Sequence, residues 1–264
     1  MLPILTYNKI DMKSTLVSIL APLCIFAMAI LCPQQAVADV FQHSWQGKMG
    51  PGISFQINFE ESTFGTLIGE TTYFRKNGKV SVIHCYGMRI GAEDDDEISY
   101  FLTEYVGTKV CGYITLSLKG GRLEHGSWSL LDKVYEMYDM EEPDYIPFFD
   151  YFMPVGGPND AAGEYSFTYT TGNPSFPESG GHCTITMKGP DTIHWEMSQV
   201  TPNIAEASGD SKMTGPYFEG RHGDFTFEAY VDKQIIYVKD TSPANIETDD
   251  WGAWATIEGV YVRK

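Results

Sequence analysis

The chain has 264 residues, and its 35 acidic against 18 basic side chains give a net charge of −17. A charge this negative is repelled by nucleic acids and by anionic membrane surfaces, so the composition argues against both as partners. The charge selects no function by itself, because a strongly acidic surface also serves solubility.

Residues 1–38 are expected to be a signal peptide. Lys9 and Lys13 give a positive start, and the run from residue 14 to residue 32 is apolar and uncharged. The tripeptide AVA that ends the segment is typical of a signal-peptidase site and places cleavage before Asp39. We therefore expect export to the periplasm, the cell surface or the medium, with no membrane span in the mature chain.

Two other interpretations of this segment remain. The apolar run is long enough to anchor the chain in a bilayer, although Pro22 and the AVA tripeptide favour cleavage. A lipid anchor on Cys24 or Cys32 is disfavoured, because leucine precedes both cysteines where lipoprotein signals resembling known ones have a small residue.

Short β-strands joined by tight turns follow the signal. Apolar and polar residues alternate strictly in ISFQINFE, as in a strand with one buried and one solvated face. Asn77-Gly78 is a strong hairpin signal, since both residues accept positive φ. Residues Leu131–Met140 read as one or two helical turns. Strands are expected at Ile53–Glu60, Leu67–Phe74, Val80–Ile90, Ile98–Tyr105, Val110–Leu118 and Leu123–Leu130.

The second half of the chain also reads as short β-strands joined by turns, but its apolar and polar residues alternate less regularly. Residues Thr201–Lys212 and Thr241–Asp250 are polar and are expected to be loops. Strands are expected at Glu164–Thr170, His182–Lys188, Thr192–Val200, Phe225–Val231, Gln234–Asp240 and in the closing residues Ala255–Lys264.

The predicted fold is all-β, an antiparallel meander barrel or a strongly coiled sheet. Glycines inside strands favour tight coiling; they are Gly69, Gly87, Gly112, Gly126 and Gly259. We expect a first module at residues 39–136, a connecting segment at 137–160 and a second module at 161–264. One continuous barrel or sandwich is the alternative arrangement.

Metal and disulfide sites are not indicated. His84-Cys85 recurs as His182-Cys183, but consecutive strand residues point to opposite faces, so neither pair can hold one ion. The acidic loop at residues 93–97 lacks the ligand spacing of a calcium loop. A bridge between Cys85 and Cys111 is disfavoured, because another strand is expected between theirs, whereas a bridge to Cys183 stays open.

No catalytic motif is present, neither the G-x-S-x-G elbow nor H-E-x-x-H. Strand carboxylates could face each other as a glycosidase pair, but no feature selects two among Glu60, Glu70, Glu104 and Glu124. We therefore predict no catalytic residues, no cofactor and no metal, with a glycan hydrolase as a rival function.

The start of the mature chain, Ser44-Trp45-Gln46-Gly47, and its end, Ile257–Val262, resemble lipocalin-like secreted barrels. His43 stands where the lipocalin G-x-W motif has glycine, and in Gly163-Glu164-Tyr165 a tyrosine replaces the tryptophan. The resemblance implies a barrel whose mouth binds a small apolar molecule.

The segment Tyr138–Pro154 (YDMEEPDYIPFFDYFMP) combines aromatic residues, acids and prolines. Its prolines exclude a regular helix or a central strand, while a plain linker is poor in aromatics. We expect its rings to pack into the seam between modules, to cap a barrel mouth or to dock a partner. The candidate binding residues are Tyr145, Phe148, Phe149, Tyr151 and Phe152.

Non-catalytic binding of a small apolar ligand, or of a protein or glycan of the cell envelope, is thus the leading expectation. An adhesion or structural surface module is the second rival.

Overall fold

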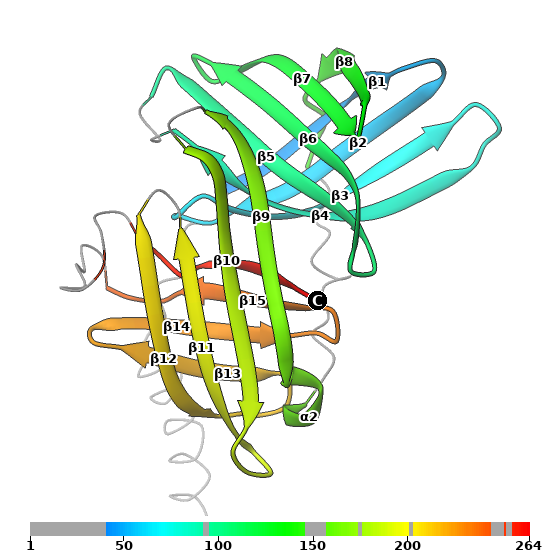
Figure 1. Ribbon diagram of the computed structural model, residues 1–264. Helices are drawn as coiled ribbons and strands as arrows, with labels where there is room; N and C mark the ends of the chain where they lie inside the picture. Colours follow the sequence, from blue (N-terminus) through cyan, green and yellow to red (C-terminus); the bar gives the residue numbers. More distant parts are fainter. Residues whose placement is uncertain are drawn as a thin grey trace, which may run out of the picture. The chain divides into compact units, whose positions relative to one another are not determined.

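The computed structural model describes residues 41–91, 95–145, 157–173, 176–200, 203–243, 251 and 255–264. These residues belong to one compact unit that spans Ala38–Lys264. Apart from the one-turn helix α2 (Pro158–Ala161), their regular structure is β-strand, which confirms the predicted all-β class (Figure 1). No helix within these ranges is long and apolar enough to cross a membrane.

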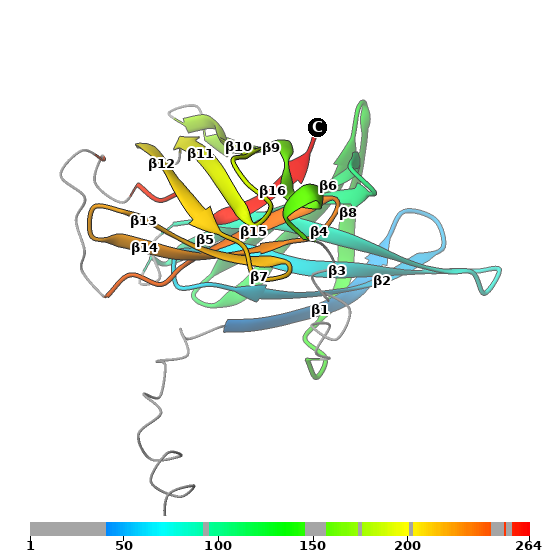
Figure 2. The ribbon, with the colours of Figure 1, turned by 90° about the horizontal axis from the view of Figure 1, so that it is seen from below.

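The first half of the chain is a closed antiparallel barrel of eight strands (Figures 1 and 2). The strands are β1 (Phe41–Met49), β2 (Ile53–Glu61), β3 (Thr66–Arg75), β4 (Val80–Ile90), β5 (Glu97–Val106), β6 (Lys109–Lys119), β7 (Arg122–Leu130) and β8 (Lys133–Glu141). Each strand pairs with the next along the chain, so the predicted meander is confirmed. The barrel closes where β1 pairs with β8, at Lys48↔Tyr138 and Met49↔Met137.

The inward side chains of this barrel form one core. Alternation in β2 sends Phe55, Ile57 and Phe59 inward. Burying a side chain of this size contributes roughly 1.5–3 kcal/mol. Seven side chains of this core are among the largest that are fully buried: Phe55, Ile57, Phe59, Leu67, Leu102, Ile114 and Leu116.

Close strand approach requires glycine at two interior positions. A Cβ on Gly87 would lie 1.7 Å from the carbonyl oxygen of Phe101, and a Cβ on Gly69 would lie 2.2 Å from that of Asn58. No side chain fits at either distance, so both positions permit the tight coiling that the sequence predicts.

The second half is an eight-stranded antiparallel sheet in the order β12-β11-β10-β9-β16-β15-β14-β13. Its strands are β9 (Gly163–Asn173), β10 (Phe176–Met187), β11 (Thr192–Val200), β12 (Ile204–Lys212), β13 (Tyr217–His222), β14 (Phe225–Val231), β15 (Ile235–Asp240) and β16 (Gly259–Arg263). The first and last strands pair, as at Ser166↔Val262. The order is therefore that of an eight-stranded barrel opened between β12 and β13.

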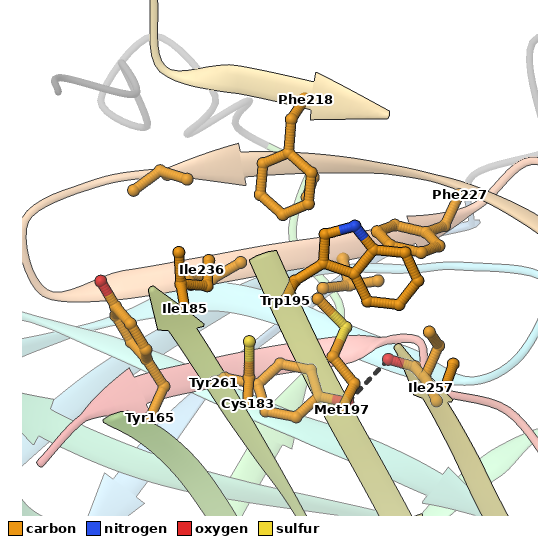
Figure 3. Packing of buried hydrophobic residues seen from close by; sticks show 14 of the residues in the cluster. Tyr165, Cys183, Ile185, Trp195, Met197, Phe218, Phe227, Ile236, Ile257 and Tyr261 are labelled. Atoms are coloured by element: carbon orange, nitrogen blue, oxygen red, sulfur yellow. Dashed lines mark hydrogen bonds between the residues drawn. The ribbon is translucent and has the colours of Figure 1, made fainter. Parts of the chain in front are cut away.

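Side chains connect the two edges of that opening. Ser211 on β12 donates its hydroxyl hydrogen to the carbonyl oxygen of Glu219 on β13, at 2.5 Å. Trp195 Nε1 donates to the same hydroxyl oxygen at 2.9 Å. The indole ring of Trp195 also packs edge-on against Phe227, with ring centroids 4.9 Å apart (Figure 3). The hydrophobic core of the second half, which includes Trp195 and Phe227, therefore extends to the gap between β12 and β13.

Two sequence predictions about secondary structure are wrong. Residues Leu131–Met140 were expected to form helical turns, but β8 occupies most of them, and the predicted module boundary at residue 136 falls inside this strand. Only Met137 of β8 is buried, so an alternating apolar pattern is missing. The polar stretch Thr201–Lys212 was expected to be a loop, but Ile204–Lys212 is strand β12. Its inward positions are the small residues Ala205, Ala207, Gly209 and Ser211, so a hydrophobicity pattern does not show the alternation.

Candidate functional site

Four rings meet inside the first barrel and are here called the ring cluster: His43, Trp45, Phe59 and Tyr100. His43 and Trp45 are two residues apart on β1, so both point inward. The imidazole stacks on the indole at 5.4 Å between centroids and 9° between planes. Phe59 and Tyr100 lie 5.0 Å and 5.1 Å from the imidazole. Trp45, Phe59 and Tyr100 are buried in the barrel core, and the imidazole of His43 lies against them at one end of the barrel.

The indole nitrogen of Trp45 lacks a hydrogen-bond partner among the described residues. Trp45 is only 3% exposed, so water does not reach this N–H from the surface. A buried donor without an acceptor costs about 1–3 kcal/mol. The ring cluster therefore offers a bound molecule one unsatisfied donor.

A charged group borders the ring cluster. His43 Nε2 lies 2.9 Å from Glu61 Oε2, and Arg89 Nε donates to Glu61 Oε1 at 2.5 Å. Burial would raise the pKa of Glu61, but the hydrogen bond of His43 and the charge of Arg89 together hold that pKa below its ordinary value. Glu61 is therefore ionised at neutral pH and fixes the imidazole orientation. His43 keeps a side-chain exposure of 21%, so the imidazole is the part of the cluster that faces the solvent, and it covers the buried rings behind it.

A second polar group lies near the opposite end of the barrel. Glu104 accepts hydrogen bonds from the hydroxyl of Tyr73 at 2.6 Å and from Trp128 Nε1 at 2.8 Å. A register shift follows Glu104 in its pairing with β6. A Cβ on Gly112 would lie 2.5 Å from Glu104 Oε2, so this glycine makes room for the carboxylate. Burial raises the pKa of Glu104 despite these donors. Both carboxylate oxygens of Glu104 accept a hydrogen bond from a side chain of the barrel. The arrangement fits a structural role.

The third group joins the two halves and is here called the seam. Its apolar part consists of Ile68, Tyr86, Tyr105, Ile235, Val260 and Val262. The carboxylate of Glu258 lies fully buried beside it. One oxygen accepts the hydroxyl hydrogen of Ser62, and the other accepts the backbone N–H of Asp240 at 2.8 Å. Burial raises the pKa of Glu258 to about 7.

Tyr145 is the predicted binding residue that the structure describes. Its ring packs against the seam, and its hydroxyl donates to Glu60 Oε1 at 3.0 Å. Burial and the neighbouring carboxylate of Glu60 raise the pKa of Tyr145. The other four predicted binding residues lie outside the described residues: Phe148, Phe149, Tyr151 and Phe152.

Glu60 and Glu70 both lie near Tyr145. Across β2 and β3, Glu60 pairs with Ile68 and Asn58 pairs with Glu70, so the two acids are diagonal neighbours on one face. Burial raises the pKa of both. Glu104 lies inside the barrel and Glu124 is exposed, so the structure does not bring the four sequence candidates together.

In each of the two His-Cys pairs, the histidine and the cysteine point to opposite faces of their strand. Cys85 and Cys183 are buried while His84 and His182 are exposed, as opposite faces require. Within the described ranges the cysteines, Cys111 included, are free thiols, and no group of three His, Cys, Asp or Glu side chains could hold a metal ion.

Sequence reasoning missed most of the ring cluster's surroundings. Trp45 is part of the sequence resemblance to lipocalin-like barrels. His43 precedes Trp45 by two residues in the same strand, so the sequence also indicates that both side chains share a face. The partners Glu61, Arg89 and Tyr100 come from other strands and need the barrel register to meet: Arg89 pairs with Tyr100 across β4 and β5.

Comparisons with known proteins found a likeness among solved structures only. No protein-family model matches the chain, and no curated protein matches it. Among solved structures, it is similar to a protein of unknown function from the DUF3598 family of Nostoc punctiforme PCC 73102. The two are 11% identical, with 86% of this chain and 93% of that chain covered and a TM-score of 0.30.

Proposed function

We propose that the first barrel binds a small, flat and largely apolar molecule that carries a hydrogen-bond acceptor, without transforming it. The observation that carries this proposal is the buried N–H of Trp45, which has no acceptor among the described residues although it lies in the ring cluster. An aromatic surface with a few placed polar groups is the usual composition of a small-molecule site.

The neighbouring groups suit such a ligand. A planar molecule can stack on the aromatic faces while its acceptor meets the indole N–H. The ion pair of Glu61 and Arg89 holds His43 at the entrance, so the imidazole can adjust the access of the ligand. The proposal extends the lipocalin-like resemblance of the sequence and takes the protein to be exported, as its signal-like first residues indicate.

Native mass spectrometry of protein purified from its own cell envelope tests the proposal directly, since a co-purifying small molecule is expected. A titration with the aromatic probe 1-anilinonaphthalene-8-sulfonate, whose sulfonate oxygens are hydrogen-bond acceptors, tests the site. Trp45→Phe keeps a ring but removes the donor, so we expect about tenfold weaker binding, the effect of one lost hydrogen bond. Trp251→Phe is the matched control, because Trp251 donates to the carbonyl oxygen of Glu206 elsewhere.

Two outcomes would overturn the proposal. One is the absence of any bound molecule across gentle preparations together with no binding of the probe. The other is equal affinity of the probe for Trp45→Phe and for the unmodified protein.

A second candidate function is carboxylate-dependent hydrolysis of glycans. It is favoured by the diagonal placement of Glu60 and Glu70 on one face, since diagonal residues lie about 7–8 Å apart in a sheet. From such positions two carboxyl groups can reach the separation that glycosidases use. Release of reducing sugar that is lost in both Glu60→Gln and Glu70→Gln, but not in Glu124→Gln, would support it.

A further inference from the structure

Exposed apolar side chains gather on three hairpins of the first barrel. The turns β3–β4, β5–β6 and β7–β8 emerge at the same end, because alternate connections of an up-and-down barrel share an end. We call this end the hairpin end. Its exposed apolar residues are Phe74, Val80, Val82, Val106, Val110, Leu131 and Val134.

The exposure of these side chains is extreme for apolar residues. Leu131 is 93% exposed and Val106 is 62% exposed. Leu131 also has a φ of 55°, a left-handed conformation that is costly for leucine. The backbone is thus held in a strained turn that presents a leucine to the solvent. Clustered exposed apolar residues of this kind mark interaction sites.

Basic side chains accompany the apolar ones on every one of these hairpins. Arg75, Lys76 and Lys79 lie at the β3–β4 turn, Lys109 at β5–β6 and Lys133 at β7–β8. Among the described residues none of these five has an ion-pair partner. The only acid in the three turns is Asp132. At the opposite end, Asp95 and Asp96 precede Glu97, the first residue of β5. The barrel is therefore basic at one end and acidic at the other.

We propose that the hairpin end docks on an anionic lipid bilayer surface. Two contributions hold interfacial proteins on anionic membranes: apolar side chains enter the membrane interface, and neighbouring lysine and arginine side chains attract the anionic lipids. The β3–β4 hairpin reaches furthest, since Val80–Ile83 extend past the first pair of β4 with β5, His84↔Tyr105 (Figure 1).

The negative charge of the whole chain does not prevent this contact. A strand of ten residues is about 33 Å long, whereas charges are screened over about 8–10 Å at physiological ionic strength. The acidic end therefore contributes little to the potential at the hairpin end. The net charge of the whole chain argues against anionic membranes as partners, but it does not do so for the hairpin end, where the local charge is positive.

Sedimentation with lipid vesicles tests the proposal on the compact unit Ala38–Lys264. Vesicles of phosphatidylcholine mixed with phosphatidylglycerol should bind it, more weakly as salt is added, and vesicles of phosphatidylcholine alone should not. Each cation near the surface is worth roughly a fivefold change in partitioning. The double variant Lys76→Glu with Lys79→Glu should therefore bind at least about 25-fold more weakly.

Two controls separate the hairpin end from general effects. Arg122→Glu with Lys212→Glu changes the net charge equally but lies elsewhere, and should leave binding unchanged. Leu131→Asn suits the left-handed turn, so it should keep the fold while weakening binding. Phe64→Ser, which removes a ring 51% exposed at the opposite end, should not weaken it.

Three outcomes would overturn the proposal. One is no binding to the anionic vesicles, and another is equal weakening by the two double variants. The third is a dimer, seen by light scattering, that Leu131→Asn dissociates, because a second copy would then cover the hairpin end.

Discussion

Ser62 donates its hydroxyl hydrogen to the carboxylate of Glu258, across 196 positions of sequence. This bond fixes the connection between β2 and β3 to the residues that lead into β16. Because Glu258 is fully buried and its pKa is raised to about 7, the bond lies at a titratable contact between the two halves.

The first prediction concerns Glu258 and pH. Between the ordinary pKa of 4.5 and the folded value of about 7, the folded protein holds the proton while the unfolded chain has lost it. Stability therefore falls as pH rises through this window, by on the order of 3 kcal/mol, and levels off above it. Glu258→Gln should remove this contribution. Urea unfolding at both ends of the window checks it, with the exposed Glu124→Gln as control; parallel losses in Glu258→Gln and the unmodified protein would contradict it.

A second prediction compares two buried tryptophans. Trp195→Phe removes a donor that serves Ser211, whereas Trp45→Phe removes a donor without a protein partner. Both variants lose the same atoms, so the difference between their free energies of unfolding reports the hydrogen bond from Trp195 to Ser211. In protein refolded free of small molecules, Trp195→Phe should lower the free energy of unfolding by about 1 kcal/mol more than Trp45→Phe. The reverse order would show that the Trp45 N–H is satisfied.

The third prediction concerns Gly87, whose missing Cβ lets β4 and β5 approach. Gly87→Ala places a carbon against the backbone of Phe101 and should cost about 3 kcal/mol or more. Gly78→Asn is the control, because Gly78 has a φ of 78° with no atom nearby, and asparagine tolerates that conformation. Soluble yield and the midpoint of thermal unfolding check both variants. A Gly87→Ala protein as stable as the control would refute the close approach.

A fourth prediction concerns thiol reactivity. Burial raises the pKa of Cys111 to about 11 and keeps Cys85 and Cys183 protonated and covered. In the native protein, a disulfide reagent such as DTNB should react slowly with Cys111 alone near neutral pH, because the thiolate is the reactive form. In guanidinium chloride all three thiols of the compact unit should react quickly. Rapid reaction of more than one thiol in the native state would contradict the described burial.

Where alternation is strong, the sequence predicted the fold closely. The expected strand Ile53–Glu60 is β2, Ile53–Glu61, because every second residue had a large apolar side chain to bury. In β12 the inward residues are alanine, glycine and serine, which leave little hydrophobic signal. A Cβ on Gly209 would lie 2.6 Å from the indole of Trp195, so the glycine makes room for that ring. The strand conformation of such a segment depends on the strands that pair with it and on the side chains that pack over it, and a single sequence does not show these contacts.

The candidate site was less predictable for a related reason. Trp45 could be singled out, and His43 follows from strand parity. The ion pair of Glu61 with Arg89 depends on which strands are adjacent and in which register. The charge of the hairpin end was hidden likewise, since its cations are dispersed over three turns and outweighed in the total count.

Closure of each half by its own first and last strands has a kinetic consequence. Met49 pairs with Met137, and Ser166 pairs with Val262, so both closures join residues nearly a whole half apart. Contacts of such high sequence separation slow folding, because the loop entropy is lost before the pairing is gained. The first barrel can close as soon as β8 has been synthesised, whereas the sheet of the second half gains its β9–β16 pairing only after β16 has been synthesised. We therefore expect the slowest folding step to be the docking of β16 between β9 and β15.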